Sequence, residues 1–422
     1  MCSRLPITVG ETKPAPGDLY RGTMSESWRV ALAAAMGGAI VSGLAACSSP
    51  SAALPAASVD SGLMGTHGIV TFVSTQVGWV VAPHPRLHST AVYSTADGGL
   101  NWVHWGTLPG EAGPVALSES AVLLKPVGPD GLSSALVFSS DGAQWESRRL
   151  PFEDRGFNIE IQFLADLQHG WLVHGRNPPS PADLFRTTDG GRSWQQLATK
   201  DLTYNESGGS SPVFWNTSEG AMFLLRDKSF VVLRTHDSGA TWQQSDVAAI
   251  DAKREIQTTA DLSFSPDLPT MFDDLRGLLS IHVYSQTDTA PDSPLRKFRY
   301  VTRTADGGNH WSAAELIRLP ATGQLTFFDD RRWLLVGERR VQFTRDSGVT
   351  WHEAEGLDES LLRGAWPSFR VIGAERNVAF LGFVTDDIEW VVNTTDAGAH
   401  WQAVPLPDVR EASWANGRPP QG

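Results

Sequence analysis

The sequence predicts an all-β fold, a single seven-bladed β-propeller, and three observations support this prediction. A short pattern with Asp, Gly and Trp at fixed places occurs seven times along the chain. The copies recur at intervals close to the length of a four-stranded blade. Between them, short apolar runs alternate with turns rich in Gly, Pro, Asp and Ser, which is typical of many short strands.

The repeated pattern reads Ser or Thr, any residue, Asp, any residue, Gly, two residues and Trp, and only the second copy is one residue shorter. Its aspartates, which are 44, 48, 48, 69, 40 and 50 residues apart, are Asp97, Asp141, Asp189, Asp237, Asp306, Asp346 and Asp396. Its tryptophans are Trp102, Trp145, Trp194, Trp242, Trp311, Trp351 and Trp401. Because seven of the 16 tryptophans stand at this one place, chance does not explain the pattern, and seven copies predict seven blades.

Each part of the pattern suits a tight hairpin. The Ser or Thr ends a strand, the Asp carboxylate accepts hydrogen bonds from backbone N–H groups of the turn, and Gly adopts a positive φ at little steric cost. The Trp opens the next strand and covers the turn with about 200 Å² of apolar surface. We therefore expect these aspartates to be structural, rather than catalytic or metal-binding.

Further apolar runs complete each repeat. In the first repeat we expect strands at 69–73 and 78–81, then 91–94 entering the hairpin and 102–105 leaving it, which makes four strands. The predicted blades are 66–108, 113–150, 159–200, 211–248, 260–319, 322–357 and 366–407. The fifth is the longest, and its extra residues, 266–292, are rich in Pro, Asp and Ser. We expect them to form a loop on one face of the disc, where loops often carry function.

A targeting segment is expected before the propeller. Residues 30–46 carry no charge and follow Arg29; this run is shorter than the roughly 20 residues that span a bilayer, but it suits a signal peptide. It leads into Leu44-Ala45-Ala46-Cys47, which resembles the lipobox of bacterial lipoproteins and implies that Cys47 is acylated as the mature N-terminus. The alternative is an uncleaved short anchor.

The sequence thus divides into four parts. Residues 1–46 are the signal region, in which Met24 is an alternative start, and 47–64 are the lipidated cysteine and a flexible tether rich in Ser, Pro and Ala. The propeller occupies 65–408, and 409–422 form a tail. We expect an extracytoplasmic protein, lipid-anchored in the bacterial cell envelope. With Cys2 and Cys47 as the only cysteines, no disulfide framework can stabilise the propeller.

The charge of the chain limits its partners. The 47 acidic and 34 basic residues give a formal net charge of −13, which argues against nonspecific binding of nucleic acid or anionic lipid through the protein surface. Any basic binding patch must therefore be local. We expect a monomer whose partner is an envelope protein or a glycan, with the membrane reached through the lipid anchor and no nucleic acid bound.

The repeat resembles the Asp box of the bacterial neuraminidase repeat superfamily, and over residues 65–408 the chain is most similar to the photosystem II stability and assembly factor type of propeller. Blades of that type contain a Phe strand, a Gly-Trp strand and a Thr-x-Asp-Gly-Gly-x-x-Trp hairpin, and here Phe72, Gly78-Trp79 and residues 95–102 follow this order. The resemblance implies the fold but no single role, because Asp boxes occur in sialidases, xyloglucanases, sorting receptors and noncatalytic binding proteins.

A divergent sialidase-like exo-glycosidase, with its site at the central mouth, is the alternative to a noncatalytic scaffold. Such an enzyme needs an arginine cluster, a Tyr–Glu pair and an Asp acid/base. The family's Phe/Tyr-Arg-Ile-Pro motif has its nearest match at 369–372, which lacks the Pro, so Arg370 is expected to be an ordinary strand residue. Tyr93 and Tyr300 fall in strands that enter hairpins. The sequence predicts no cofactor and shows no convincing metal-ligand spacing.

Four arginines are the candidate binding patch. Arg331, Arg332, Arg339 and Arg340 flank the short apolar run 333–336. If that run is a strand that ends near a turn, we expect the two pairs to lie at one edge of the blade, where they suit a carboxylate or phosphate. A solvated turn paired with Asp329, Asp330 and Glu338 is the alternative. The sequence as a whole favours a noncatalytic scaffold for assembly or adhesion.

Overall fold

A computed structural model of the protein describes residues 68–84, 87–127, 134–152, 159–174, 183–197, 212–226, 229–246, 256, 262–267, 269–285, 294–337, 340–357, 370–375, 377–385, 388–407 and 409. The predicted signal region, Cys47, the tether and Arg339 lie outside the described residues. Within the described part of the chain, no helix is both long and apolar enough to cross a membrane.

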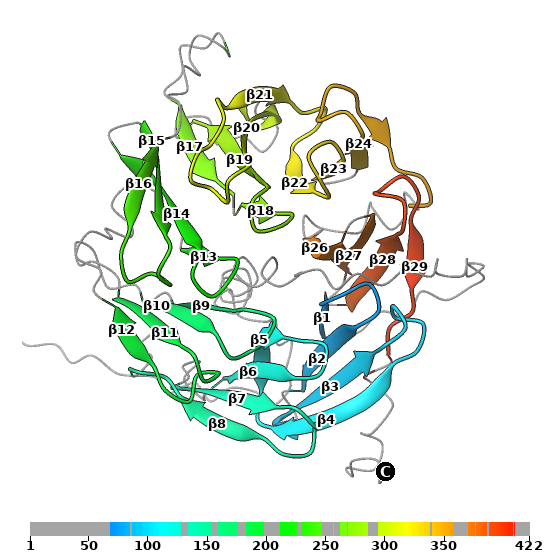
Figure 1. Ribbon diagram of the computed structural model, residues 1–422. Coiled ribbons are helices and arrows are strands. Elements are labelled where there is room, and N and C mark those ends of the chain that lie inside the picture. Colours follow the sequence, from blue (N-terminus) through cyan, green and yellow to red (C-terminus); the bar gives the residue numbers. More distant parts are fainter. Residues whose placement is uncertain are drawn as a thin grey trace, which may run out of the picture.

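Seven antiparallel sheets stand in a ring, with the first strand of each sheet nearest the centre (Figure 1). This confirms the predicted all-β, seven-bladed propeller. Blades 1 and 2 contain β1 (Ile69–Phe72), β2 (Gly78–His84), β3 (Ser89–Thr95), β4 (Val103–Pro109), β5 (Ala112–Leu117), β6 (Val122–Pro126), β7 (Ala135–Ser139) and β8 (Glu146–Arg149). Blades 3 and 4 contain β9 (Ile159–Phe163), β10 (Gly170–His174), β11 (Asp183–Thr187), β12 (Gln195–Leu197), β13 (Val213–Phe214), β14 (Gly220–Arg226), β15 (Ser229–Thr235) and β16 (Gln243–Asp246).

The remaining blades follow the same order, except that blade 5 has five strands. It contains β17 (Ser263–Pro266), β18 (Thr270–Met271), β19 (Gly277–Tyr284), the short 3-10 helix η2 (Pro294–Lys297), β20 (Phe298–Thr304) and β21 (Glu315–Arg318). Blades 6 and 7 contain β22 (Gly323–Phe327), β23 (Trp333–Gly337), β24 (Val341–Thr344), β25 (His352–Glu353), β26 (Arg370–Glu375), β27 (Val378–Thr385), β28 (Ile388–Thr394) and β29 (Gln402–Val404).

The extra residues of blade 5 differ from the expected loop. Residues 270–284 belong mostly to β18 and β19, and β17 and β18 both pair with β19 as two parts of one interrupted innermost strand. Residues 286–293 lie outside the described part of the chain. The prediction of one long loop is therefore wrong for 270–284, because alternation of apolar residues in 278–283 outweighs the polar flanks.

The up-and-down order of the strands gives the ring two faces. The turns between first and second strands and the hairpins between third and fourth strands lie on one side, which we call the hairpin face. Connections between second and third strands, and those between blades, lie on the other side, which we call the loop face. Backbone hydrogen bonds reflect this sorting: Gly307 N donates to Leu275 O on the hairpin face, and Leu319 N donates to Lys297 O on the loop face.

The hydrophobic core lies between neighbouring blades, and the ring closes by the same packing. All four strands of blade 1 and of blade 7 are consecutive in the chain. Phe72 of blade 1 stacks on Phe380 of blade 7 with ring centroids 3.6 Å apart, and Trp102 Nε1 donates to Pro405 O at 2.8 Å. The blade-to-blade contact therefore closes the ring without an exchanged strand.

Candidate binding face

A buried hydroxyl holds each hairpin together. In blade 3, Thr187 Oγ1 accepts a hydrogen bond from Gly191 N at 2.8 Å and donates one to Asp189 Oδ1 at 2.8 Å. The same arrangement forms at the other six third-strand ends, Thr95, Ser139, Thr235, Thr304, Thr344 and Thr394. All seven residues are buried. Each fourth strand begins after the hairpin Trp rather than at it.

The aspartates are occupied by hydrogen bonds from within their own hairpins. Asp189 Oδ1 accepts from Ser193 N at 2.9 Å, and Asp189 Oδ2 accepts from Ser193 Oγ at 2.6 Å. In the six full-length copies, the residue before the Trp supplies both donors: Asn101, Ser193, Thr241, His310, Thr350 and His400. The repeated pattern allows any residue at this position, although each of the six copies holds a side chain that can donate.

These hydrogen bonds keep the carboxylates charged. Burial raises the pKa of Asp189, but the hydrogen bonds from Ser193 and Thr187 outweigh burial and lower that pKa to about 2. Hydrogen bonds from Thr350 and Thr344 lower the pKa of Asp346 to about 2 as well. A carboxylate that is charged and already bonded on both oxygens is poorly suited to proton transfer near neutral pH. The hydrogen bonds that these carboxylates accept come from within their own hairpins.

The shortened second copy leaves room for a close backbone approach. Gly142 has φ of 70°, and a Cβ added there would lie 1.9 Å from the Trp105 carbonyl oxygen. A Cβ added to Gly106 would meet the Gly142 carbonyl oxygen at 2.3 Å. Trp105 packs edge-on against Trp145 at 6.1 Å. Only glycines allow β4 to pass this close to the hairpin of blade 2.

A second repeated turn, which the sequence analysis did not identify, joins first and second strands. Its first side chain accepts hydrogen bonds from the backbone N–H groups two and three residues further on. In blade 5, Asp273 Oδ1 accepts from Leu275 N at 2.9 Å and Arg276 N at 2.6 Å. The turn recurs at Ser74, Ser118, Asp166, Asn216 and Asp329. Its signal is a Ser, Asp or Asn soon after the first apolar run of each repeat.

Charged side chains from the turns of blades 5 and 6 form one network, which we call the charged arc and define as Asp273, Arg276, Asp329, Asp330 and Arg332. Arg276 Nε lies 2.7 Å from Asp273 Oδ2, and Arg276 Nη1 lies 3.9 Å from Asp330 Oδ2 in the next blade. Arg332 Nη2 lies 2.6 Å from Asp329 Oδ2, and Arg332 Nη1 donates to Asn377 Oδ1 of blade 7. The network therefore links three blades.

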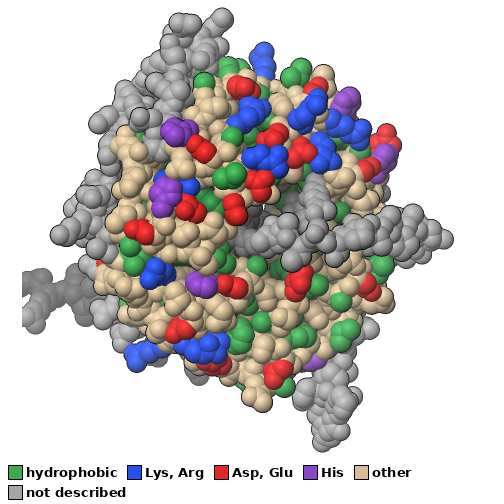
Figure 2. All heavy atoms as spheres, in the orientation of Figure 1, with side chains coloured by type: hydrophobic (Ala, Val, Ile, Leu, Met, Phe, Trp, Pro, Cys, Tyr) green, Lys and Arg blue, Asp and Glu red, His purple; other side chains and the backbone are tan. Residues whose placement is uncertain are grey.

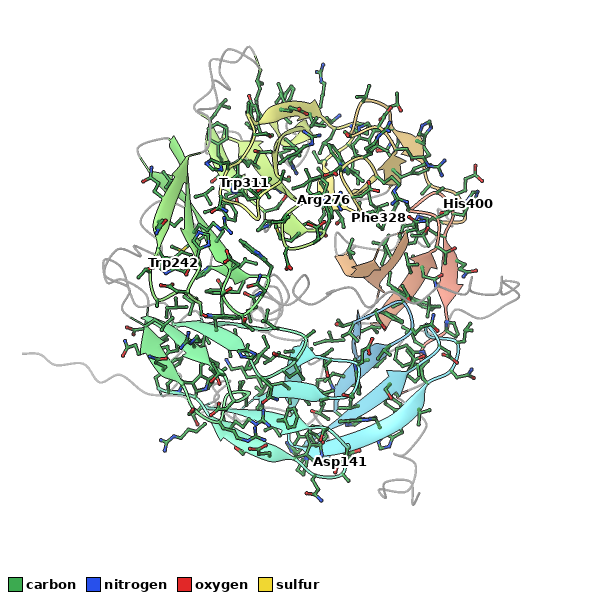
Figure 3. The ribbon with its side chains drawn as sticks, in the orientation of Figure 1. Asp141, Trp242, Arg276, Trp311, Phe328 and His400 are labelled. Atoms are coloured by element: carbon green, nitrogen blue, oxygen red, sulfur yellow. The ribbon has the colours of Figure 1, made fainter. Side chains whose placement is uncertain are left out.

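The charged arc is open to solvent on the hairpin face. Arg276 is 58% and Asp330 48% exposed. Figure 2 shows acidic and basic side chains intermingled over blades 5 and 6, and Figure 3 places Arg276 on the inner part of the ring and His400 on its outer part. Leu275, which is 58% exposed, and Arg331, which is also exposed, stand at the tips of the same two turns.

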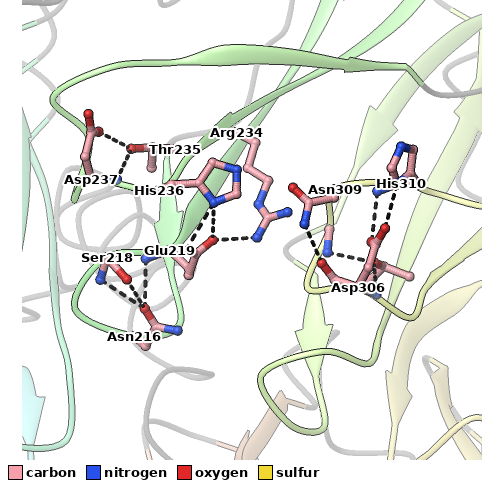
Figure 4. A network of polar contacts seen from close by, with 12 residues as sticks. Asn216, Ser218, Glu219, Arg234, Thr235, His236, Asp237, Asp306, Asn309 and His310 are labelled. Carbon is pink, nitrogen blue, oxygen red and sulfur yellow. Dashed lines mark hydrogen bonds and ion pairs between the residues drawn. The ribbon is translucent and has the colours of Figure 1, made fainter.

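The seam between blades 4 and 5 holds a more deeply buried polar group. Arg234 Nη2 donates to Glu219 Oε2 at 2.5 Å, and His236 Nδ1 lies 2.9 Å from the same oxygen (Figure 4). The Arg234 side chain is only 5% exposed, and a Cβ added to Gly307 of the next blade would lie 3.3 Å from Arg234 Nη2. Arg234 therefore fills the seam, and Glu219 balances its charge.

Of the four arginines predicted to form one patch, the three that the structure describes do not come together. Arg331 and Arg332 precede β23 and Arg340 follows it, and five residues of extended strand span about 17 Å. They therefore lie on opposite faces, so the expectation of one shared edge is wrong. Arg332 pairs with Asp329, and Arg340 Nη1 lies 3.3 Å from Glu353 Oε1. Arg339 lies outside the described residues.

Residues considered for catalysis are dispersed in the described structure. Arg370 is the first residue of β26, and Tyr93 and Tyr300 are buried. In blade 5, besides the hairpin pair of His310 and Asp306, His282 Nε2 lies 2.8 Å from Asp267 Oδ1, and both of these side chains are about one third exposed. Among the described residues, no group of three or more His, Cys, Asp or Glu is placed to hold a metal ion.

Comparison with known proteins supports the fold. No family model and no curated protein matches the chain. A puromycin-hydrolysing peptidase of Mycobacterium tuberculosis is similar in structure, with a TM-score of 0.50, 14% identity, and coverage of 81% of this chain and 55% of that one. A GH74 xyloglucanase of Xanthomonas campestris matches with a TM-score of 0.26, 16% identity, and coverage of 81% and 57%.

A third similar structure is itself a propeller domain. The β-propeller domain of the Trilobed protease of Pyrococcus furiosus has a TM-score of 0.43, 9% identity, and coverage of 80% of this chain and 96% of that one. The chain spans little more than half of the length of the peptidase and of the xyloglucanase. At these identities the likeness concerns the propeller fold alone.

Proposed function

We propose that this chain is a noncatalytic, lipid-anchored protein of the cell envelope that binds a partner protein through the hairpin face of blades 5 and 6. The observation that carries the proposal is the charged arc with Leu275 and Arg331 beside it. Arginine is enriched at protein–protein interfaces, and an apolar side chain with a polar rim suits such an interface, whereas isolated surface ion pairs contribute little to stability.

The turns that display this surface are rigid. The backbone N–H groups of Leu275 and Arg276 donate to Asp273, and the Leu275 carbonyl accepts from Gly307 N at 2.7 Å. A rigid surface loses little conformational freedom on binding. Among the described residues, the exposed large apolar side chains are Leu and Val with no aromatic ring, so a protein is favoured over a glycan that stacks on aromatic faces.

The proposal also includes a lipid anchor at Cys47 and membership of the Asp-box superfamily. Cys47 would hold the protein at the membrane, and the seven Thr/Ser–Asp hairpins support membership of the Asp-box superfamily with an assembly or adhesion role. We expect Cys47→Ser to abolish acylation of the mature N-terminus, which mass spectrometry of the N-terminal peptide measures directly. An unmodified Cys47 in the native cell would contradict the anchor but not the binding surface.

A pull-down from native envelope extract tests the binding surface. The mature chain carrying Arg276→Glu and Arg331→Glu is compared with the wild type and with Arg192→Glu, an exposed hairpin residue of blade 3. We expect a protein captured by the wild type and by Arg192→Glu, and lost with the double variant. Equal capture of the partner by the wild type and the double variant would refute a role for the charged arc.

A glycosidase is the second candidate function, and the Asp267–His282 pair is the observation that favours it. A carboxylate that orients an imidazole is a recurring acid–base device, and this pair lies where the innermost strand of blade 5 is interrupted. Hydrolysis of fluorogenic sialosides or other glycosides, lost in His282→Gln, would support this function. Absence of turnover across the panel would leave binding of a partner protein as the proposed function.

A further inference from the structure

A group of cations lies on the loop face of blade 5, opposite the charged arc. Arg296 and Lys297 end η2, and Arg318 ends β21. Arg296 and Arg318 are exposed and Lys297 is half-buried. We call Arg296, Lys297 and Arg318 the basic patch. In a chain with a net charge of −13, three neighbouring cations are a local reversal of sign.

The basic patch is built on a fixed platform. Leu319 N donates to Lys297 O at 2.7 Å, which holds the end of β21 against η2. Phe298 and Arg318 are cross-strand partners, and the Arg318 guanidinium lies 5.4 Å from the Phe298 ring. Beneath them, the buried Arg299 donates to the Arg296 and Phe298 carbonyls at 2.8 and 3.0 Å. The backbone that carries the three cations is therefore held in place.

The ion pairing of the basic patch differs from that of the charged arc. On the hairpin face, Arg276 and Arg332 each have an Asp partner within 3 Å. Within the described part of the chain, Lys297 and Arg318 form no ion pair with a carboxylate. Lys297 and Arg318 can therefore both face an extended anionic surface, which neutralises several charges at once.

The described part of the chain begins on this same face. β1 begins at Ile69, whose cross-strand partner Val81 lies toward the connection between the second and third strands of blade 1. The first described strand therefore begins on the loop face. Cys47 precedes residue 68 by the 20 residues 48–67, and the tether expected from the sequence would reach about 25 Å, so a lipid on Cys47 would keep the loop face near the membrane.

We propose that the basic patch binds the phosphate groups of anionic phospholipid headgroups in the membrane that holds Cys47. The proposal rests on the lipid anchor of the proposed function. Each Lys or Arg near an anionic membrane surface contributes about fivefold in affinity. The patch orients the propeller, so that the charged arc on the opposite face points away from the membrane and toward a partner.

Vesicle sedimentation tests the basic patch in a protein that lacks the covalent lipid anchor. The protein is the mature chain 47–422 with Cys47→Ser, which keeps every described element, and the vesicles are phosphatidylcholine alone or equal parts of phosphatidylcholine and phosphatidylglycerol. We expect binding to the anionic vesicles only, weakened by salt. Lys297→Gln with Arg318→Gln should lower the affinity about 25-fold. Arg192→Gln with Arg345→Gln removes the same charge from the hairpin face and should leave binding unchanged.

The outcomes separate this proposal from the anchor. The proposal is overturned if the protein does not bind anionic vesicles, or if the two double variants lose vesicle affinity equally. If inorganic phosphate binds the protein with no vesicles present while anionic vesicles do not bind, the patch belongs to a soluble phosphate ligand and the proposal is also overturned. Because the vesicle assay uses Cys47→Ser, its result does not depend on acylation, which the mass of the native N-terminal peptide decides separately.

Discussion

Replacing Thr187 with Val tests whether the buried hydroxyl holds its hairpin. Val has nearly the same shape, but it leaves the Gly191 N–H without the acceptor that lies 2.8 Å away in Thr187. An unsatisfied buried donor costs about 1–3 kcal/mol. For a propeller of about 340 residues the unfolding entropy is about 0.7 kcal/mol/K, so the Tm should fall by about 1.5–4 °C.

Scanning calorimetry measures this change, and two further variants calibrate it. Thr326 lies in β22, and its hydroxyl makes no hydrogen bond within the described residues, so Thr326→Val should change the Tm by less than about 1 °C. Thr187→Ser keeps the hydroxyl and should recover most of the loss. The reasoning is refuted if Thr187→Val is no less stable than Thr326→Val.

Three other predictions concern different parts of the chain. Gly142→Ala should destabilise the protein by about 2–4 kcal/mol in denaturant titration, because φ is 70° and the Trp105 carbonyl oxygen lies 1.9 Å from the added Cβ. Gly113→Ala is the control and should not destabilise the protein, because a Cβ added at Gly113 has no atom within 4 Å. The hydrogen bond to Asp396, followed by the charges of Asp396 and Glu355, raises the pKa of His400. The stabilising effect of protonated His400 is therefore present below about pH 6.5 and disappears as pH rises through the raised pKa. In an NMR titration Asp396→Asn should lower the pKa of His400, and an unchanged pKa would contradict the assignment. Cys47→Ser should move the protein from the membrane to the soluble fraction, and retention in the membrane at high salt would show a second attachment.

The fold could be predicted because the hairpin pattern places chemically distinct residues at fixed spacing. Thr187, Asp189 and Gly191 each have a local partner, so their roles follow from the sequence of one hairpin. The donor before each Trp was missed because Asn, Ser, Thr and His look unrelated until their shared bond to Asp Oδ2 is seen.

The candidate site could not be predicted in the same way. Arg331 and Arg340 are close in the sequence, but one strand carries the chain between them to the opposite face. Conversely, Arg332 meets Asn377, 45 residues away, because neighbouring blades place their turns between first and second strands side by side. The charge of a face depends on strand length and on contacts between blades, which composition does not reveal.

Photocrosslinking in the native cell tests the central claim most directly. A benzophenone amino acid replaces Arg331 beside the charged arc or, in a separate strain, Val349, which is 80% exposed on the hairpin of blade 6. A binding protein should give one discrete crosslinked partner from position 331, reduced by Arg276→Glu and weak or absent from position 349. The same products from both positions, or a product from 331 that Arg276→Glu does not change, would contradict binding through the charged arc.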